Sequence, residues 1–82
     1  MRIPHELPEE FPGEARFIEQ LSRSNHEFQR LAAAYADVNQ QIYRIESEDE
    51  PTSDEVLQVL RKRRLKLKDD IAAVLMKLER RM

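Results

Sequence analysis

Apolar residues between positions 28 and 45 recur at alternating intervals of three and four, at Phe28, Leu31, Tyr35, Val38, Ile42 and Ile45. This is the spacing of the a and d positions of a heptad repeat, whereas the faces of a strand repeat every two residues. The pattern therefore predicts a helix with one apolar stripe. A second helix is needed to cover such a stripe.

The C-terminal half carries a matching stripe at Leu57, Leu60, Arg64, Leu67, Ile71, Val74 and Leu78. When the two segments are laid antiparallel, a single register pairs every layer, from Ile45 opposite Leu57 to Phe28 opposite Val74. Arg64 faces Val38 in this register, and its aliphatic stem can lie along the seam while the guanidinium group reaches water. We predict that the apolar residues of both stripes form the core seam between the two helices.

Prolines and acidic residues set the expected boundaries. Residues 1–12 contain prolines at positions 4, 8 and 12, a spacing that prevents a helix. We expect an acidic, proline-rich mobile arm here, whose Phe11 can dock on the helices, and the alternative is a disordered tail. The helical domain then spans 13–82, with one helix at about 14–46, an acidic turn at 47–52 and a second helix at about 53–81.

Two capping patterns refine these boundaries. Thr52 follows the helix-ending Pro51 and is a candidate N-cap, with Glu55 completing a capping box. Ser24 and Glu27 have the same Ser-x-x-Glu spacing. A break of the first helix near Ser24 is therefore an open alternative to one continuous helix.

The expected fold is all-α: an antiparallel two-helix hairpin that resembles a coiled coil. Two helices cover only one stripe of each other, and the seam leaves out Ile18, Val59, Leu65, Leu75 and Met82. We expect these residues to form a second face through which two copies dimerise into a four-helix bundle. The alanines at positions 32–34 and 36 either stiffen the first helix or allow close approach of another helix, and both readings stay open.

Composition and charge narrow the class of protein. The 82-residue chain has no cysteine, which excludes disulfides, thiolate metal ligands and cysteine nucleophiles. Residues 1–50 carry 5 basic and 11 acidic side chains, and residues 51–82 carry 9 basic and 5 acidic ones, giving charges of −6 and +4. Opposite charges favour folding of one half on the other, or association between copies. Because no apolar run could span a membrane and the N-terminus lacks a signal-peptide core, we expect a soluble cytoplasmic protein.

A basic run in the second helix is the feature that suggests a ligand. Its candidate nucleic-acid contacts are Arg61, Lys62, Arg63, Lys66 and Lys68. These cations are spread around more than two turns of helix, and no aromatic residue between them could stack on a base. A solvated face that balances the acidic first helix is the simpler interpretation.

Neither catalysis nor metal binding is indicated. The two histidines, His5 and His26, lie far apart in the sequence, and neither has a second imidazole at the spacing of a metal site. A two-helix rod also offers no enclosed pocket, and no nucleophile, base and orienting group occur together. We therefore expect no cofactor, no metal, no small-molecule substrate and no enzymatic activity.

Part of the sequence resembles the YdcH-like proteins of bacteria, over about residues 17–76. The shared residues are Phe28 and Leu31, then Val38 and Ile42 with Glu46, then the stretch Leu65-Lys66-Leu67-Lys68-Asp69-Asp70-Ile71, which is the most distinctive part. Tyr35 stands where those proteins often have histidine, and the proline-rich arm is longer than usual. The resemblance implies a small, self-associating helical hairpin, in a family without an established biochemical function.

Two interpretations of the distinctive stretch follow. Lys68 and Asp69 are candidates for an intersubunit or partner contact, because the seam needs neither. The alternative is that Lys66 pairs with Asp70 one turn away and the rest is solvated.

We expect a non-enzymatic module that forms a homodimer or higher homo-oligomer and acts by binding another protein. Binding of nucleic acid through the basic run is the second hypothesis.

Overall fold

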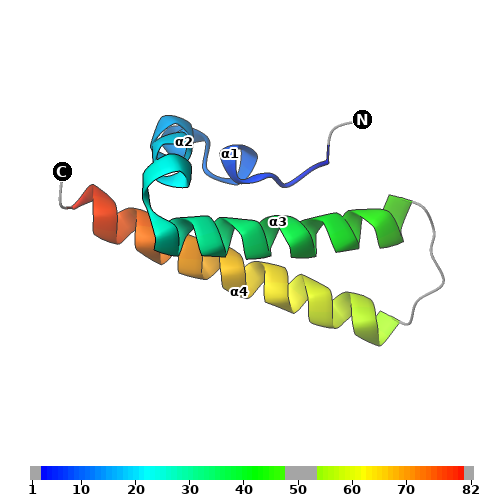
Figure 1. The fold of residues 1–82 in the computed structure, drawn as a ribbon. Coiled ribbons are helices and arrows are strands. Elements are labelled where there is room, and N and C mark those ends of the chain that lie inside the picture. The colour runs from blue at the N-terminus through cyan, green and yellow to red at the C-terminus, as the bar shows by residue number, and fades with distance from the viewer. Residues whose placement is uncertain (1–2, 48–53, 81–82) are drawn as a thin grey trace.

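The computed structural model describes residues 3–47 and 54–80, and all regular structure in these residues is helical. The elements are α1 (Leu7–Glu10), a 3-10 turn η1 (Pro12–Glu14), α2 (Ala15–Ser24), α3 (His26–Ser47) and α4 (Asp54–Glu79) (Figure 1). The predicted all-α class is confirmed. The capping box at Thr52, most of the predicted turn at 47–52 and Met82 lie outside the described residues.

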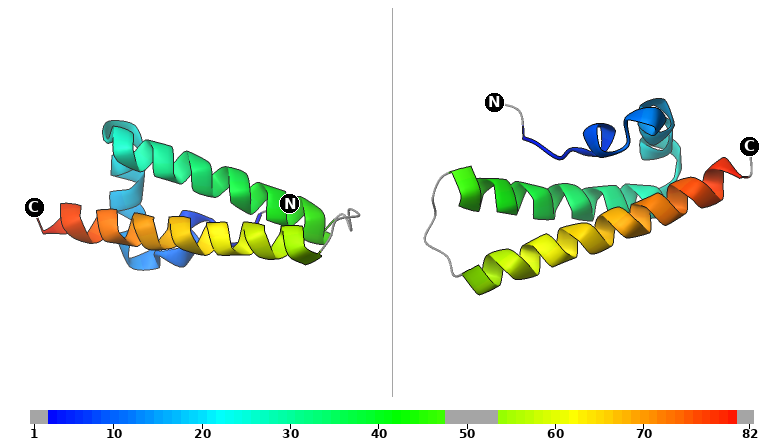
Figure 2. Two further views of the ribbon diagram at one scale, coloured as in Figure 1. Left: turned by 90° about the horizontal axis from the view of Figure 1, so that it is seen from below. Right: turned by 180° about the vertical axis from the view of Figure 1, so that it is seen from behind.

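The long helices α3 and α4 run in opposite directions and lie side by side (Figures 1 and 2). Their apolar side chains form two clusters. One is centred on Phe28, Tyr35 and Ile71, and the other on Val38, Ile42 and Leu60. Every residue of the predicted seam lies in or against one of these clusters, including the half-buried Leu31, Ile45, Leu57, Leu67 and Leu78.

The structure differs from a continuous helix over residues 14–46, because the chain bends at Asn25 between α2 and α3. Asn25 has extended backbone angles (φ −123°, ψ 114°), and its side-chain Oδ1 accepts a 2.8 Å hydrogen bond from the Phe28 amide. Asparagine is among the best N-cap residues because its oxygen satisfies an amide that the first helical turn leaves unpaired. The break thus follows Ser24, but Asn25 is the cap, while the Ser24 hydroxyl donates to the Gln20 carbonyl at 3.0 Å.

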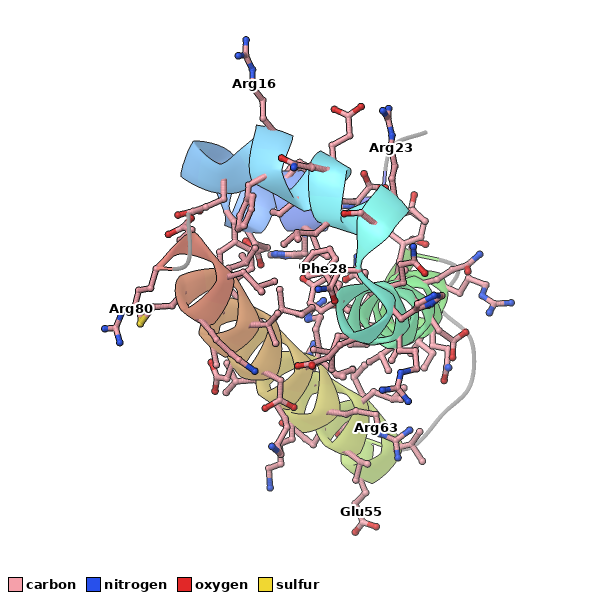
Figure 3. The ribbon with its side chains drawn as sticks, turned by 60° about the vertical axis from the view of Figure 1, so that its left-hand side comes forward. Arg16, Arg23, Phe28, Glu55, Arg63 and Arg80 are labelled. Carbon is pink, nitrogen blue, oxygen red and sulfur yellow. The ribbon has the colours of Figure 1, made fainter. Side chains whose placement is uncertain are left out.

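The bend folds α2 back over the end of the α3–α4 pair (Figure 1). Ile18 and Leu21 become buried in the cluster that contains Phe28 and Leu75. Figure 3 shows Phe28 in the space between α2, α3 and α4. A third helical layer therefore covers apolar surface that two helices alone would leave open.

The N-terminal segment also differs from a separate arm, since it packs on the other helices. Leu7 is buried, and Phe11, four residues later, is half-buried against the same cluster. The prolines permit α1 because Pro8 lies in its first turn, where an amide has no partner within the helix, and because the other two prolines lie outside it. Of the two sequence interpretations, docking of Phe11 describes the structure.

This packing corrects the prediction of a second apolar face through which two copies dimerise. Ile18 and Leu75 are only 5% and 3% exposed within a single chain, because the packing of α2, which carries Ile18, places both in the same apolar cluster. They cannot contribute to a surface between copies while that core is intact. Val59 and Leu65, at 58% and 59% exposed, do lie on the outside of α4.

Candidate functional site: the polar junction between α3, α4 and the N-terminal segment

The cations of the basic run point in different directions and contact different groups. Arg61 Nη2 lies 3.2 Å from Glu46 Oε2 on α3, and Lys66 Nζ lies 3.3 Å from Asp70 Oδ1. The predicted pair of Lys66 and Asp70 is thus confirmed. Both pairs are exposed, and such pairs contribute about 0.2–1 kcal/mol each. They balance charge on the surface and do not by themselves form a site.

Arg64 occupies a different environment, because its guanidinium group points into a polar junction on α3. Arg64 Nη1 donates a 3.0 Å hydrogen bond to Asn39 Oδ1. Asn39, only 4% exposed, uses its Nδ2 to donate to the Pro4 carbonyl at 2.9 Å. The Tyr35 hydroxyl donates to the next carbonyl, that of His5, at 2.5 Å. The guanidinium group therefore holds the N-terminal segment through Asn39, where the sequence suggested that it would reach water.

Two side chains next to the junction, those of Lys68 and His5, contact the following turn of the segment. Lys68 Nζ lies 3.7 Å from Glu10 Oε1 and 5.9 Å from the centre of the Phe11 ring. His5 Nδ1 lies 3.2 Å from the same Glu10 oxygen. Lys68, a candidate partner contact in the sequence, thus contacts the chain's own N-terminal segment.

The backbone at His5 is strained. Its φ of 66° lies in the left-handed region, which costs a residue other than glycine about 1–2 kcal/mol. The strained residue is held from both sides: its amide donates to Glu9 Oε2 at 3.3 Å and its carbonyl accepts from Tyr35. This conformation turns the Pro4 and His5 carbonyls toward Asn39 and Tyr35.

The junction changes the acidity of Tyr35. Burial raises the pKa of the Tyr35 hydroxyl above its usual value of 10.0, and the neighbouring carboxylate of Glu10 raises it further. The charge of Arg64 acts in the opposite direction but is a smaller influence than either. The folded state therefore favours the neutral hydroxyl, which is the form that can donate to the His5 carbonyl.

This shift predicts a loss of stability in alkali. Because the Tyr35 pKa is higher in the folded state, the unfolded chain loses this proton first as the pH rises through 10. The contribution of the neutral Tyr35 hydroxyl to the free energy of unfolding is complete below pH 10 and should decline above it. Tyr35→Phe should remove this part of the alkaline decline, and lower the free energy of unfolding at neutral pH by about 1 kcal/mol through the lost hydrogen bond. Urea unfolding at neutral and alkaline pH measures both effects, with Tyr43→Phe as the matched control.

Two open hollows flank the helices. One, of about 680 Å³, lies between the N-terminal segment, α2 and α3; it is mostly apolar, and its charged residues are Glu6 and Glu19. The other, of about 550 Å³, lies between α3 and α4 and is lined by three cations of the basic run, Lys62, Arg63 and Lys66, with Asp37. The structure thus brings together three of the five candidate nucleic-acid contacts and directs Arg61 and Lys68 elsewhere.

The described residues contain no cluster of three or more histidine, aspartate or glutamate side chains that could hold a metal ion. Within residues 3–47 and 54–80, none of the helices combines the length and the apolar character needed to cross a lipid bilayer. The polar groups of the junction are paired as well, since no buried side-chain nitrogen or oxygen in the described part of the chain lacks a hydrogen-bond partner. Their arrangement suits holding a peptide segment.

Sequence reasoning missed Asn39 and the two carbonyls that the junction holds. One signal was present: Tyr35 and Asn39 are four residues apart and so share a face of α3 beside the apolar stripe. The partners on the N-terminal segment are more than 25 residues distant, and no local pattern indicates them.

Comparison with known proteins places the chain in a family. Searches of curated proteins and of solved structures find no match. A family model described as "Protein of unknown function (DUF465)" matches residues 28–75, which cover most of α3 and α4 and leave out the N-terminal segment and α2. Because this match covers more than half of the 82 residues, the chain belongs to this family of unknown function, which includes the YdcH-like small proteins.

Proposed function

We propose that this chain is a non-enzymatic interaction module that self-associates through the outer face of α4, so that the α3–α4 hairpins of two copies form a four-helix bundle. The observation that carries the proposal is the exposure of large apolar side chains along α4. Leu65 and Met76, eleven residues apart, lie on the same side of the helix, and Val59 lies on an adjacent side. Apolar residues grouped in this way favour a contact with another chain.

Charge on the same face supports an antiparallel pairing of two α4 helices. A two-fold axis beside Leu65 would place Lys62 of one copy opposite Asp69 of the partner copy, on both sides of the axis. Both residues are exposed, and no ion pair involving either is found within the described part of the chain. Each copy therefore has an unused cation and an unused anion where its partner needs the opposite charge.

The proposal predicts that Leu65→Lys weakens the dimer. Two cations would replace two apolar groups at the centre of the contact, so we expect the dissociation constant to rise at least about tenfold. Light scattering and sedimentation over a concentration series measure this change. Ala33→Lys, a similar substitution at an exposed position of α3, should leave the mass unchanged.

A charge exchange sharpens this test. Lys62→Asp and Asp69→Lys should each weaken the dimer, and the double variant should restore it because the charges again match across the axis. A wild-type chain that stays monomeric at every concentration would contradict self-association. A dimer that ignores all three substitutions at positions 62, 65 and 69 would place the contact elsewhere.

Nucleic-acid binding is the second candidate, and the hollow lined by Lys62, Arg63 and Lys66 favours it. Three phosphate contacts correspond to a slope of about −3 in a plot of log affinity against log salt concentration. Titration of a labelled RNA and a labelled DNA at several salt concentrations tests this candidate. Arg63→Glu should abolish such binding while the dimer persists, because Arg63 is not needed for the proposed pairing of the α4 helices.

A further inference from the structure

The N-terminal segment, residues 3–11, lies on a surface of α3 and α4 as a bound peptide would. The receiving residues are Tyr35, Asn39, Arg64 and Lys68, which we call the segment site. All four are anchored on the long helices, and Arg64 fixes the orientation of Asn39 by donating to its Oδ1. The site is thus built by α3 and α4 within the residues that the family model matches, whereas the segment lies outside that match.

We propose that the segment site is a peptide-binding site, which the chain's own N-terminal segment occupies and which accepts an acidic segment of another protein in its place. The partner segment carries a leucine and a phenylalanine four residues apart, as Leu7 and Phe11 are here, with a carboxylate next to the phenylalanine. It enters through a bend like that at His5 and continues as one turn of helix.

Each part of this description comes from a contact. Asn39 and Tyr35 donate to two successive backbone carbonyls, which the left-handed backbone at His5 turns to the same side, and so they recognise the main chain in this bent conformation. Leu7 is buried beside Ile18 and Tyr35 in the apolar cluster, and this pocket selects the leucine. Main-chain hydrogen bonds combined with side-chain pockets are a recurrent mode of peptide recognition.

Lys68 supplies the preference for acidic partners. Its ammonium group faces both the Glu10 carboxylate and the Phe11 ring, so it contacts a charge and an aromatic face of the same turn. A basic segment would place a second cation against Lys68 and be repelled. The other carboxylates of the segment, including Glu6 and Glu9, are exposed. Carboxylates at these positions of a partner segment would therefore also lie at the surface.

The bound segment is replaceable, because it is held by few contacts and is strained. Pro4, His5, Glu6 and Pro8 are exposed, and Leu7 is the one buried side chain among residues 3–11. His5 keeps the left-handed backbone that glycine would adopt without cost. The segment remains bound because the chain connects it to α2, which gives it a high effective concentration at the site. A partner must compete with this tether, so weakening the chain's own contact should expose the site.

A charge exchange between Glu10 and Lys68 tests the proposal in the full chain. The probe is a fluorescently labelled peptide with the sequence of residues 3–14. In Glu10→Lys, the chain's own segment is repelled by Lys68 while the probe keeps its carboxylate. The probe should therefore bind this variant about three- to tenfold more tightly than it binds the wild-type chain, as expected for a partly exposed ion pair that is lost and replaced by repulsion.

Adding Lys68→Glu should reverse this gain, because the chain's own segment is attracted again and the probe is repelled. Glu55→Lys, the same charge change at an exposed position of α4 outside the segment site, is the matched control and should behave as the wild type. Circular dichroism confirms that each variant is folded; Glu10 and Lys68 are both partly exposed, so their exchange leaves the apolar core in place. The same fold-changes are expected in a Leu65→Lys background, which separates this site from self-association through α4.

The measurement has clear outcomes. If the probe binds Glu10→Lys no better than the wild type, or binds the double variant equally well, the segment site does not select an acidic peptide and the proposal is overturned. If a mixture of the wild-type chain and Glu10→Lys forms larger assemblies that neither forms alone, and Lys68→Glu in the second chain abolishes them, the wild-type copy supplies the segment and the site is supported with that copy as its partner.

Discussion

Replacing Phe28 with alanine should lower the free energy of unfolding by about 3–5 kcal/mol. The Phe28 side chain is fully buried and lies where α2, α3 and α4 meet (Figure 3). Its removal leaves a cavity bordered by three helices, which cannot all close on it without losing contacts elsewhere. Since small domains have a total stability of about 5–15 kcal/mol, the variant should be largely unfolded or unfold at far lower urea concentration. Urea titration followed by far-UV circular dichroism measures the change.

Arg16→Ala is the control for this prediction. Arg16 is an exposed residue of α2 that points away from the other helices (Figure 3), so its truncation should change the free energy of unfolding by no more than about 0.5 kcal/mol. Equal losses in the two variants would mean that the junction of α2, α3 and α4 is not the stable core of the molecule. Loss of helix signal confined to the ten residues of α2 would show that α2 unfolds as a separate unit.

The pairing of α3 and α4 could be predicted from the sequence because both helices are long and regular. In such helices the spacing of Phe28, Leu31 and Tyr35 directly reports which side faces the partner. The opposite stripe, from Leu57 to Leu78, contains the same period. One register therefore satisfied every apolar layer, and the two observed clusters contain these residues.

The bend at Asn25 was harder to predict because local signals supported two outcomes. The heptad register continues through Phe17 and Leu21, which favours one helix, while the polar residues at positions 24 and 25 favour a break. The burial of Leu21 and Ile18 against α3 and α4 decides between them, and this burial is a tertiary effect. The same effect removes Ile18 and Leu75 from the predicted second face, leaving Val59 and Leu65 on the outside.

The packing of the N-terminal segment was hard to predict because proline spacing describes only local backbone preferences. Pro8 is compatible with the first turn of α1, and the gain from burying Leu7 depends on a surface far away in the sequence. The carbonyls of Pro4 and His5 have no sequence signature at all, since every residue has a carbonyl. Besides the spacing of Tyr35 and Asn39, Arg64 in an apolar stripe indicated that a polar group lies opposite, and that group is Asn39.

Replacing Asn39 with alanine should lower the free energy of unfolding by about 2–3 kcal/mol, because it removes two hydrogen bonds and leaves a guanidinium group and a carbonyl without their partner. Gln40→Ala, at the adjacent exposed position, should stay within about 0.5 kcal/mol of the wild type. In Asn39→Ala, the lower free energy of unfolding should be accompanied by faster proteolysis of residues 3–11, since the Pro4 carbonyl is then held by no side chain of α3.

A double-mutant cycle with Arg64→Met then separates the two roles of Arg64. Methionine keeps most of the apolar stem and lacks the charge, so the single variant loses the Asn39 contact and retains the packing against the seam. If the guanidinium group orients Asn39, the two substitutions together should cost about 1–2 kcal/mol less than the sum of their separate costs. A coupling energy below about 0.5 kcal/mol would mean that Arg64 acts through its stem alone and that its head group is solvated, as the heptad pattern by itself suggested. The segment site would then lack the residue that fixes Asn39, and its selectivity would rest on Tyr35 and Lys68.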